Sequence, residues 1–129
     1  MNIDTQPIVQ ALGGLDGLQL AIVFGSCATG RQRPDSDFDI ALDIGQVMTV
    51  QQHIDTISAL ALATGRPIDL IDLRTVGEPL LGQILKYGQR ILGSDVIHAQ
   101  YITRHIMDMA DFVPLQQRIL RERRQAWIG

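Results

Sequence analysis

The chain of 129 residues is 46% hydrophobic but only 5% aromatic, which suits one globular domain with an aliphatic core. Its net charge of −3 speaks against a general nucleic-acid binder, since such proteins carry an excess of Lys and Arg that neutralises phosphates. The single cysteine excludes an internal disulfide framework, and the lack of a transmembrane-length apolar run or an export leader predicts a cytoplasmic protein without membrane association.

Hydrophobic periodicity predicts helices that alternate with strands. In chain order we expect a helix at 5–12, a strand at 18–24, a loop or short helix after Ser26, a strand at 37–43, a helix at 48–63, a strand at 68–73, a helix at 78–87, an edge strand at 90–92 and a helix at 94–111. Pro114 suits the first turn of a helix, so a separate last helix is expected from there to about residue 127. This order is typical of the α/β and α+β classes.

The most informative stretch joins the first two predicted strands. Gly25-Ser26 follows the first, and Asp37 and Asp39 open the second, where alternation places both carboxylates on one face. Gly25 permits a tight turn close to a ligand, Ser26 and the turn amides offer donors to phosphate, and the carboxylates suit Mg²⁺. Asp43 has the same parity but lies about 13 Å beyond Asp39 at strand rise, too far to share the same metals.

Gly25-Ser26, ten residues and then Asp37-Phe38-Asp39 resemble the GS-x10-DxD signature of the nucleotidyltransferase superfamily that includes DNA polymerase β. Within it, the chain is similar to the minimal nucleotidyltransferases, and among these to the MntA-type antitoxins that pair with HEPN-domain HepT toxins. The similarity runs from about residue 20 to about residue 93. It implies the nucleotidyltransferase fold, a small mixed β-sheet flanked by helices. We expect one domain over 1–129, with its core at about 18–93 and a C-terminal helical segment at about 94–127.

The family requires a third carboxylate, for which residues 66–73 offer Asp69 and Asp72. The two have opposite parity, so in a regular strand they cannot both face the metals. Asp69 matches the family's setting of an acid among apolar residues and is the favoured ligand. Asp72 is expected to cap the following turn or to pair with an arginine.

The resemblance implies a Mg²⁺-dependent enzyme that takes ATP as donor and works with two metal ions. Asp37 and Asp39 would hold both ions, and Asp69 would bind the catalytic ion and help to deprotonate or orient the acceptor hydroxyl.

Binding of the triphosphate is assigned to Gly25, Ser26 and Arg31. Arg31 follows Gly30 at the family's usual basic position, where a loop arginine can hold phosphate oxygens. Arg33 stays open between this role and that of a solvent-exposed charge.

The resemblance also implies the acceptor, which is a tyrosine hydroxyl of a HepT-like toxin. Addition of AMP (AMPylation) would silence the RNase activity of the toxin, so the chain would be an antitoxin and a protein adenylyltransferase that forms a hetero-oligomer with its partner. Two alternatives remain open: a non-catalytic antitoxin that occludes its toxin, and a small-molecule nucleotidyltransferase such as an antibiotic-modifying enzyme. Enzymes of the latter kind usually carry an additional helical domain, for which residues 94–129 are small.

Four arginines crowd the C-terminal region, at positions 118, 121, 123 and 124. On a helix several of them lie on one side. Two interpretations have equal weight: a solvated face with cations near a helix C-terminus, and a surface that docks against an acidic partner.

Overall fold

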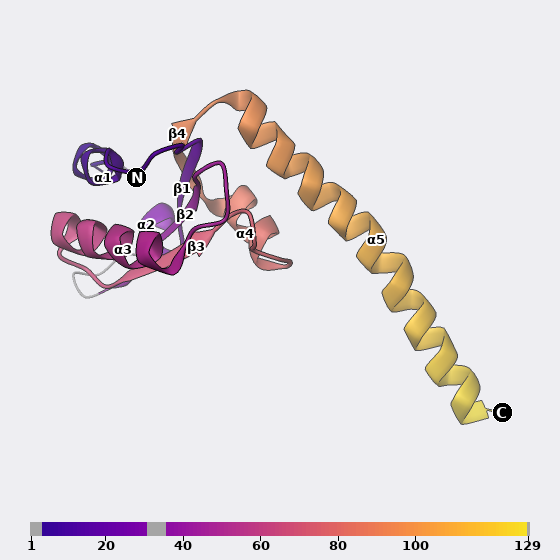
Figure 1. Ribbon diagram of the computed structural model, residues 1–129. Helices are drawn as coiled ribbons and strands as arrows, with labels where there is room; N and C mark the ends of the chain where they lie inside the picture. The colour runs from indigo at the N-terminus through magenta and orange to yellow at the C-terminus, as the bar shows by residue number, and fades with distance from the viewer. Residues whose placement is uncertain (1–3, 31–35, 129) are drawn as a thin grey trace.

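The computed structural model describes residues 4–30 and 36–128, which form a four-stranded sheet with helices on both faces (Figure 1). The strands are β1 (Leu20–Phe24), β2 (Phe38–Asp43), β3 (Ile68–Asp72) and β4 (Gln89–Gly93). The helices are α1 (Gln6–Leu12), α2 (Ser26–Thr29), α3 (Val50–Thr64), α4 (Leu80–Tyr87) and α5 (Asp95–Ile128). The predicted order of elements is confirmed from α1 to the start of α5.

The sheet is mixed, in the order β3-β2-β1-β4. β1 pairs antiparallel with both β2 and β4, whereas β2 and β3 run parallel. The expected small mixed sheet and the short strand at one edge are therefore both present. The parallel pair positions the candidate site, because it sets residues of β2 and β3 side by side in register.

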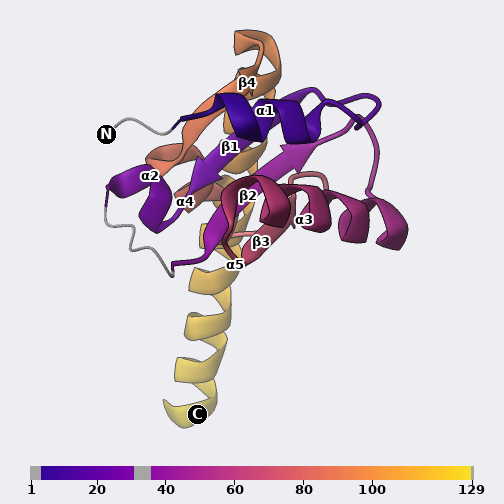
Figure 2. The ribbon, with the colours of Figure 1, turned by 90° about the vertical axis from the view of Figure 1, so that its left-hand side faces the viewer.

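Side chains on β1 alternate between two separate apolar cores. Ala21 and Val23 pack with α1 and α3 on one face, and Leu20 and Ile22 pack with α4 and the start of α5 on the other. Figure 2 shows α1 and α3 in front of the sheet with α4 and α5 behind it. A strand buried on both faces is apolar at successive positions, which explains the continuous run in β1.

The ends of α3 follow from its sequence. Thr49 accepts a hydrogen bond from the Gln52 amide, and the Gln52 side chain accepts one from the Thr49 amide, so the helix begins with a capping box. It ends at Gly65, whose φ of 68° places it in the left-handed region that glycine adopts easily. The helix predicted at 48–63 is confirmed as Val50–Thr64.

The predicted break at Pro114 is wrong, because α5 continues from Asp95 to Ile128. A proline inside a helix removes one amide donor and frees the carbonyl four residues earlier. That residue, Ala110, is exposed, so water can satisfy the carbonyl. Despite the length of α5, no helix within 4–30 and 36–128 is long and apolar enough to cross a membrane.

Candidate active site

The sheet register brings two of the predicted carboxylates together. Asp39 on β2 lies opposite Asp69 on the parallel strand β3 and opposite Phe24 on the antiparallel strand β1. Side chains alternate between the two faces of a strand, so Asp39 points to the same face as Ala41, and Asp69 to the same face as Leu73. Ala41 and Leu73 pack in the core beneath α4. Both carboxylates therefore lie on the α4 face of the sheet, near the ends of β2 and β3 where these strands begin.

Gly25 brings the backbone close to Asp39 of this pair. Its φ of 71° and ψ of −150° belong to a region that residues with a side chain rarely adopt. A Cβ atom at this position would come within 2.1 Å of Asp39 Oδ2. The turn after β1 is thus shaped by the absence of a side chain, and it holds the backbone against the carboxylate.

The carboxyl group of Asp39 is in an unfavourable setting for ionisation. Its pKa rises from 3.8 to about 6, chiefly because the group is partly buried. The negative charge of Asp69, a hydrogen bond between the two carboxyl groups and the charge of Asp37 raise it further. The folded protein therefore favours the protonated form of Asp39 more strongly than the unfolded chain does.

The donor set fits a hard divalent cation in its chemistry. Three carboxylates supply charged oxygen ligands, and the raised pKa of Asp39 reports the repulsion that a cation would relieve. Asp37 is exposed and lies just before β2, outside the close Asp39–Asp69 pair. Among the described residues, no group of three or more His, Cys, Asp or Glu side chains is already arranged to hold a metal ion.

The predicted phosphate-binding residues are only partly within the described chain. Ser26 begins α2 directly after Gly25 and is partly buried, so its position beside the turn is as expected. Arg31 and Arg33 lie outside the described residues. Arg66 is a basic residue that the sequence analysis did not single out, and its Nη1 donates to the Ser36 carbonyl at 3.4 Å, just before Asp37.

Asp72 has the structural role expected of it. Its side chain accepts hydrogen bonds from the Arg74 amide at 2.9 Å and from the Met48 amide at 2.8 Å. It is buried on the opposite face of the sheet from Asp69, as the parity of the two residues predicted. Asp72 therefore fixes the turn after β3 and is not part of the carboxylate pair.

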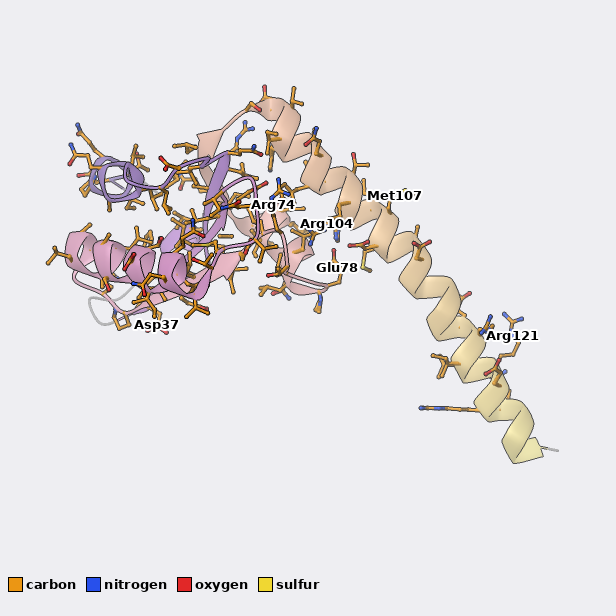
Figure 3. All side chains as sticks on the ribbon, viewed as in Figure 1. Asp37, Arg74, Glu78, Arg104, Met107 and Arg121 are labelled. Carbon is orange, nitrogen blue, oxygen red and sulfur yellow. The ribbon has the colours of Figure 1, made fainter. Side chains whose placement is uncertain are left out.

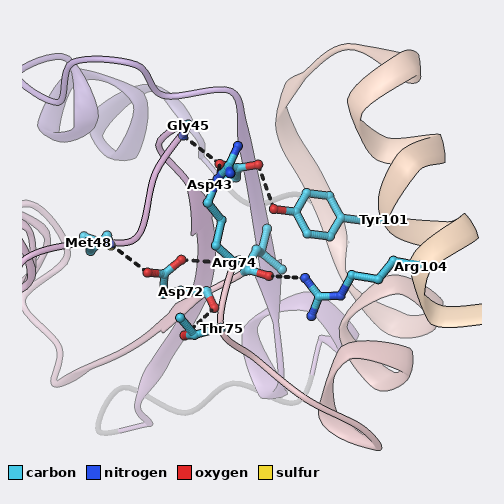
Figure 4. A network of polar contacts seen from close by, with 9 residues as sticks. Asp43, Gly45, Met48, Asp72, Arg74, Thr75, Tyr101 and Arg104 are labelled. Atoms are coloured by element: carbon cyan, nitrogen blue, oxygen red, sulfur yellow. Dashed lines mark hydrogen bonds and ion pairs between the residues drawn. The ribbon is translucent and has the colours of Figure 1, made fainter. Parts of the chain in front are cut away.

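Asp43 lies at the far end of β2 and holds α5 to the sheet (Figure 4). This buried carboxylate accepts hydrogen bonds from Tyr101 Oη at 2.7 Å, Arg74 Nε at 2.9 Å and the Gly45 amide at 2.7 Å. Burial works to raise the pKa of Asp43, but these bonds outweigh it and keep the pKa below its ordinary value. Burial and the bond to Asp43 raise the pKa of Tyr101.

Sequence reasoning excluded Asp43 from the metal site but missed this network. The signal in the sequence was the carboxylate itself, because a carboxylate at a buried strand position needs hydrogen-bond or ion-pair partners. A cavity of about 250 Å³ adjoins the network, lined by Gln19, Asp43, Arg74, Gln100, Tyr101 and Arg104. Because it lies at the opposite end of β2 from Asp39, it is not the predicted nucleotide site.

Comparison with known proteins agrees with this arrangement. The family model described as "Polymerase beta, Nucleotidyltransferase" matches residues 6–97, which is most of the chain. The chain belongs to this nucleotidyltransferase family. Its mixed sheet and flanking helices have the nucleotidyltransferase fold, and the signature that carried the resemblance lies inside the matched region.

Among relatives in this family, the protein adenylyltransferase MntA of Shewanella oneidensis is 32% identical over 77 residues. The aligned region covers 60% of this chain and 55% of the relative, so the chain spans about half the length of the curated relative that it matches.

Two solved structures show how far the similarity in fold extends. A chain from a toxin–antitoxin crystal structure with AMP-PNP matches with a TM-score of 0.82 and 25% identity, over 93% of this chain and 98% of that chain. A chain from the complex of tri-AMPylated Shewanella oneidensis HEPN toxin with MNT antitoxin matches with a TM-score of 0.72 and 23% identity, over 89% and 91%. The second likeness concerns the fold alone.

Proposed function

We propose that this nucleotidyltransferase is an antitoxin that transfers AMP from ATP to a tyrosine of a HEPN-domain RNase toxin and thereby neutralises it. The observation that carries the proposal is the register of Asp39 with Asp69, beside a glycine turn with no room for a side chain. The names of the relatives support the same reaction, since one is a protein adenylyltransferase and another chain was solved with AMP-PNP.

In this proposal each site residue has a separate task. Gly25 and Ser26 bind the triphosphate through the turn, and Arg31 binds its phosphate oxygens. Asp37, Asp39 and Asp69 hold Mg²⁺, which when bound offsets the negative charge of the triphosphate and of the carboxylates. The raised pKa of Asp39 supports this assignment, because three mutually repelling carboxylates are stabilised by a cation.

The transfer itself is an in-line substitution at the α-phosphorus. The tyrosine oxygen forms a bond to the α-phosphorus as the bond to the oxygen that bridges to the β-phosphate breaks, and pyrophosphate leaves. Asp69 orients the tyrosine hydroxyl and accepts its proton. The acceptor becomes a tyrosyl–AMP phosphodiester, and the toxin and the antitoxin associate as a hetero-oligomer during the reaction. The cytoplasmic location and the single-domain organisation remain predictions from the sequence.

Labelled ATP tests the assignment directly. Wild type and the Asp39→Asn variant are each incubated with ATP carrying a labelled α-phosphate and with the HEPN-domain toxin of the proposed pair. We expect wild type to label the partner and Asp39→Asn to lose at least a hundredfold in rate. Asp55→Asn is the matched control, because Asp55 is an exposed carboxylate on α3 that bonds only within its own helix.

Equal labelling by wild type and Asp39→Asn would remove Asp39 from the site. If the variant fails to label the toxin but still neutralises it in cells, the chain is a sequestering antitoxin instead.

A further inference from the structure

The C-terminal helix extends well beyond the body of the protein (Figure 1). We call residues 106–124 of α5 the arm. All of its described side chains are exposed except that of Met109, which is partly buried. At 1.5 Å per residue the arm is about 28 Å long. In Figure 3 Met107 and Arg121 lie along it, on the other side of the molecule from Asp37.

The arm is held in a defined direction by the turn of α5 that precedes it. Tyr101 bonds to the buried Asp43, and Arg104 donates to the carbonyl oxygens of Leu73 and Val76. His105 Nδ1 lies 2.7 Å from Glu78 Oε1. These bonds connect one helical turn to β2 and to the segment between β3 and α4. A helix fixed in this way is pre-organised, so a partner that binds it loses less entropy.

One side of the arm combines exposed apolar groups with arginines. Ile106 and Leu120 are 58% and 59% exposed, and at 100° per residue both lie within about 40° of Arg124 around the helix axis. Near the tip, Gln117, Leu120, Arg121 and Arg124 line one shallow groove. Apolar side chains repeated along a helix face are the anchors by which helices dock into apolar grooves of other proteins.

The charge near the tip of the arm indicates which kind of protein binds it. Residues 117–124 contain four Arg and one Glu, a net charge of +3 in a chain whose total is −3. Two such segments repel each other, which disfavours a symmetric pair of copies that brings the tips of the two arms together. An arm docked on the acidic body of a second copy makes a head-to-tail contact, and such contacts build rings or open filaments. The better fit is a different protein with acidic residues around an apolar groove.

We propose that the arm face formed by Ile106, Leu120, Arg121 and Arg124 is the docking surface for the protein that accepts the nucleotidyl group. The identity of this partner rests on the proposed function. The match to the chain from the toxin–antitoxin structure with AMP-PNP omits only 7% of this chain, whereas α5 makes up about a quarter of it. Most of α5 therefore has a counterpart in a chain that was crystallised in such a complex.

The test measures binding and transfer separately. The full-length chain and its Arg121→Glu/Arg124→Glu variant are titrated with the HEPN-domain toxin of the proposed pair, by calorimetry at low salt and at high salt. We expect the variant to bind at least tenfold more weakly. Its affinity should also depend less on salt, because salt screens the attraction between charges at the rim of an interface. Lys86→Glu is the control, since Lys86 is an exposed cation on α4, and its affinity should stay within twofold of wild type.

Kinetics and helicity identify the cause of the loss. In the double variant the KM for the protein acceptor should rise about tenfold while kcat and the thermal shift caused by ATP stay unchanged, and far-UV circular dichroism should show α5 intact. Binding within twofold of wild type would overturn the proposal, and so would a wild type that does not bind the HEPN-domain protein, or an arm-dependent dimer of this chain alone. Normal binding without AMP transfer would contradict the proposed function but not the arm.

Discussion

Asp39 carries an electrostatic cost in the folded protein. Its carboxylate lies beside Asp69 and near Asp37, and its pKa of about 6 exceeds the value of 3.8 that applies to the unfolded chain. The contribution of this group to stability is therefore fully present below about pH 4 and is lost as the pH rises through 6. A neutral side chain of the same shape avoids this cost.

We predict that Asp39→Asn stabilises the metal-free protein at pH 7 while abolishing transfer. The gain should be about 1 kcal/mol, which is smaller than the pKa change alone suggests because the group is partly exposed. Thermal unfolding with a chelator present checks it, and the advantage of the variant should vanish near pH 4. A lower Tm for Asp39→Asn than for wild type at pH 7 would contradict the electrostatic cause.

Gly25→Ala is predicted to disrupt the site through backbone conformation and space together. A Cβ at position 25 would meet Asp39 Oδ2 at 2.1 Å, and the φ of 71° would strain any other residue. We expect at least a hundredfold loss of AMP transfer in a rate assay.

Gly65→Ala is the control, since φ at Gly65 is 68° but nothing lies within 4 Å of an added Cβ. That variant should lose about 1 kcal/mol of stability and keep its activity. Similar activities for the two variants would show that the contact with Asp39 is unimportant.

Among the elements, α5 is joined to β2 by a buried hydrogen bond near its start. Tyr101→Phe removes the bond to Asp43 and leaves that buried carboxylate with Arg74 and the Gly45 amide. We expect a loss of about 1–2 kcal/mol in the free energy of unfolding, measured with urea, because a charged acceptor loses a donor. Tyr87→Phe is the control on an exposed tyrosine and should change the free energy of unfolding by less than about 0.5 kcal/mol. Equal effects of the two substitutions would argue against the network.

The elements differ in how well the sequence predicts them. Strand parity placed Asp69 and Asp72 on opposite faces, and the structure has them there, because burial on both faces of the sheet fixes the register. The preference of proline for the first turn of a helix led to a wrong helix start at Pro114, since an exposed helix can lose one backbone bond to water. The partners of Asp43 were not predictable, because Arg74 and Tyr101 lie 31 and 58 residues away; the pairing of β3 with β2 brings Arg74 to Asp43, and the packing of α5 brings Tyr101.

At the scale of the whole molecule, nucleotide and metal are predicted to stabilise the protein together. Wild type should gain about 2.7 kcal/mol when a non-hydrolysable ATP analogue with Mg²⁺ is present at a hundred times its Kd. A chelator should remove most of this gain, and Asp39→Asn and Asp69→Asn should show little of it. Thermal shift measurements on wild type with Mg²⁺, on wild type with the chelator and on the two variants check this prediction. A full shift of wild type with the chelator present would contradict the metal assignment.

The central claim is that the site around Asp39 and Asp69 adds AMP to a protein partner. The intact mass of the HEPN-domain protein, co-expressed with wild type or with Asp39→Asn, tests it most directly. We predict that co-expression with wild type increases the mass by whole adenylyl units on tyrosine, and that Asp39→Asn leaves it unmodified. A partner of unchanged mass beside the wild-type chain, or the same increments beside the variant, would contradict the claim.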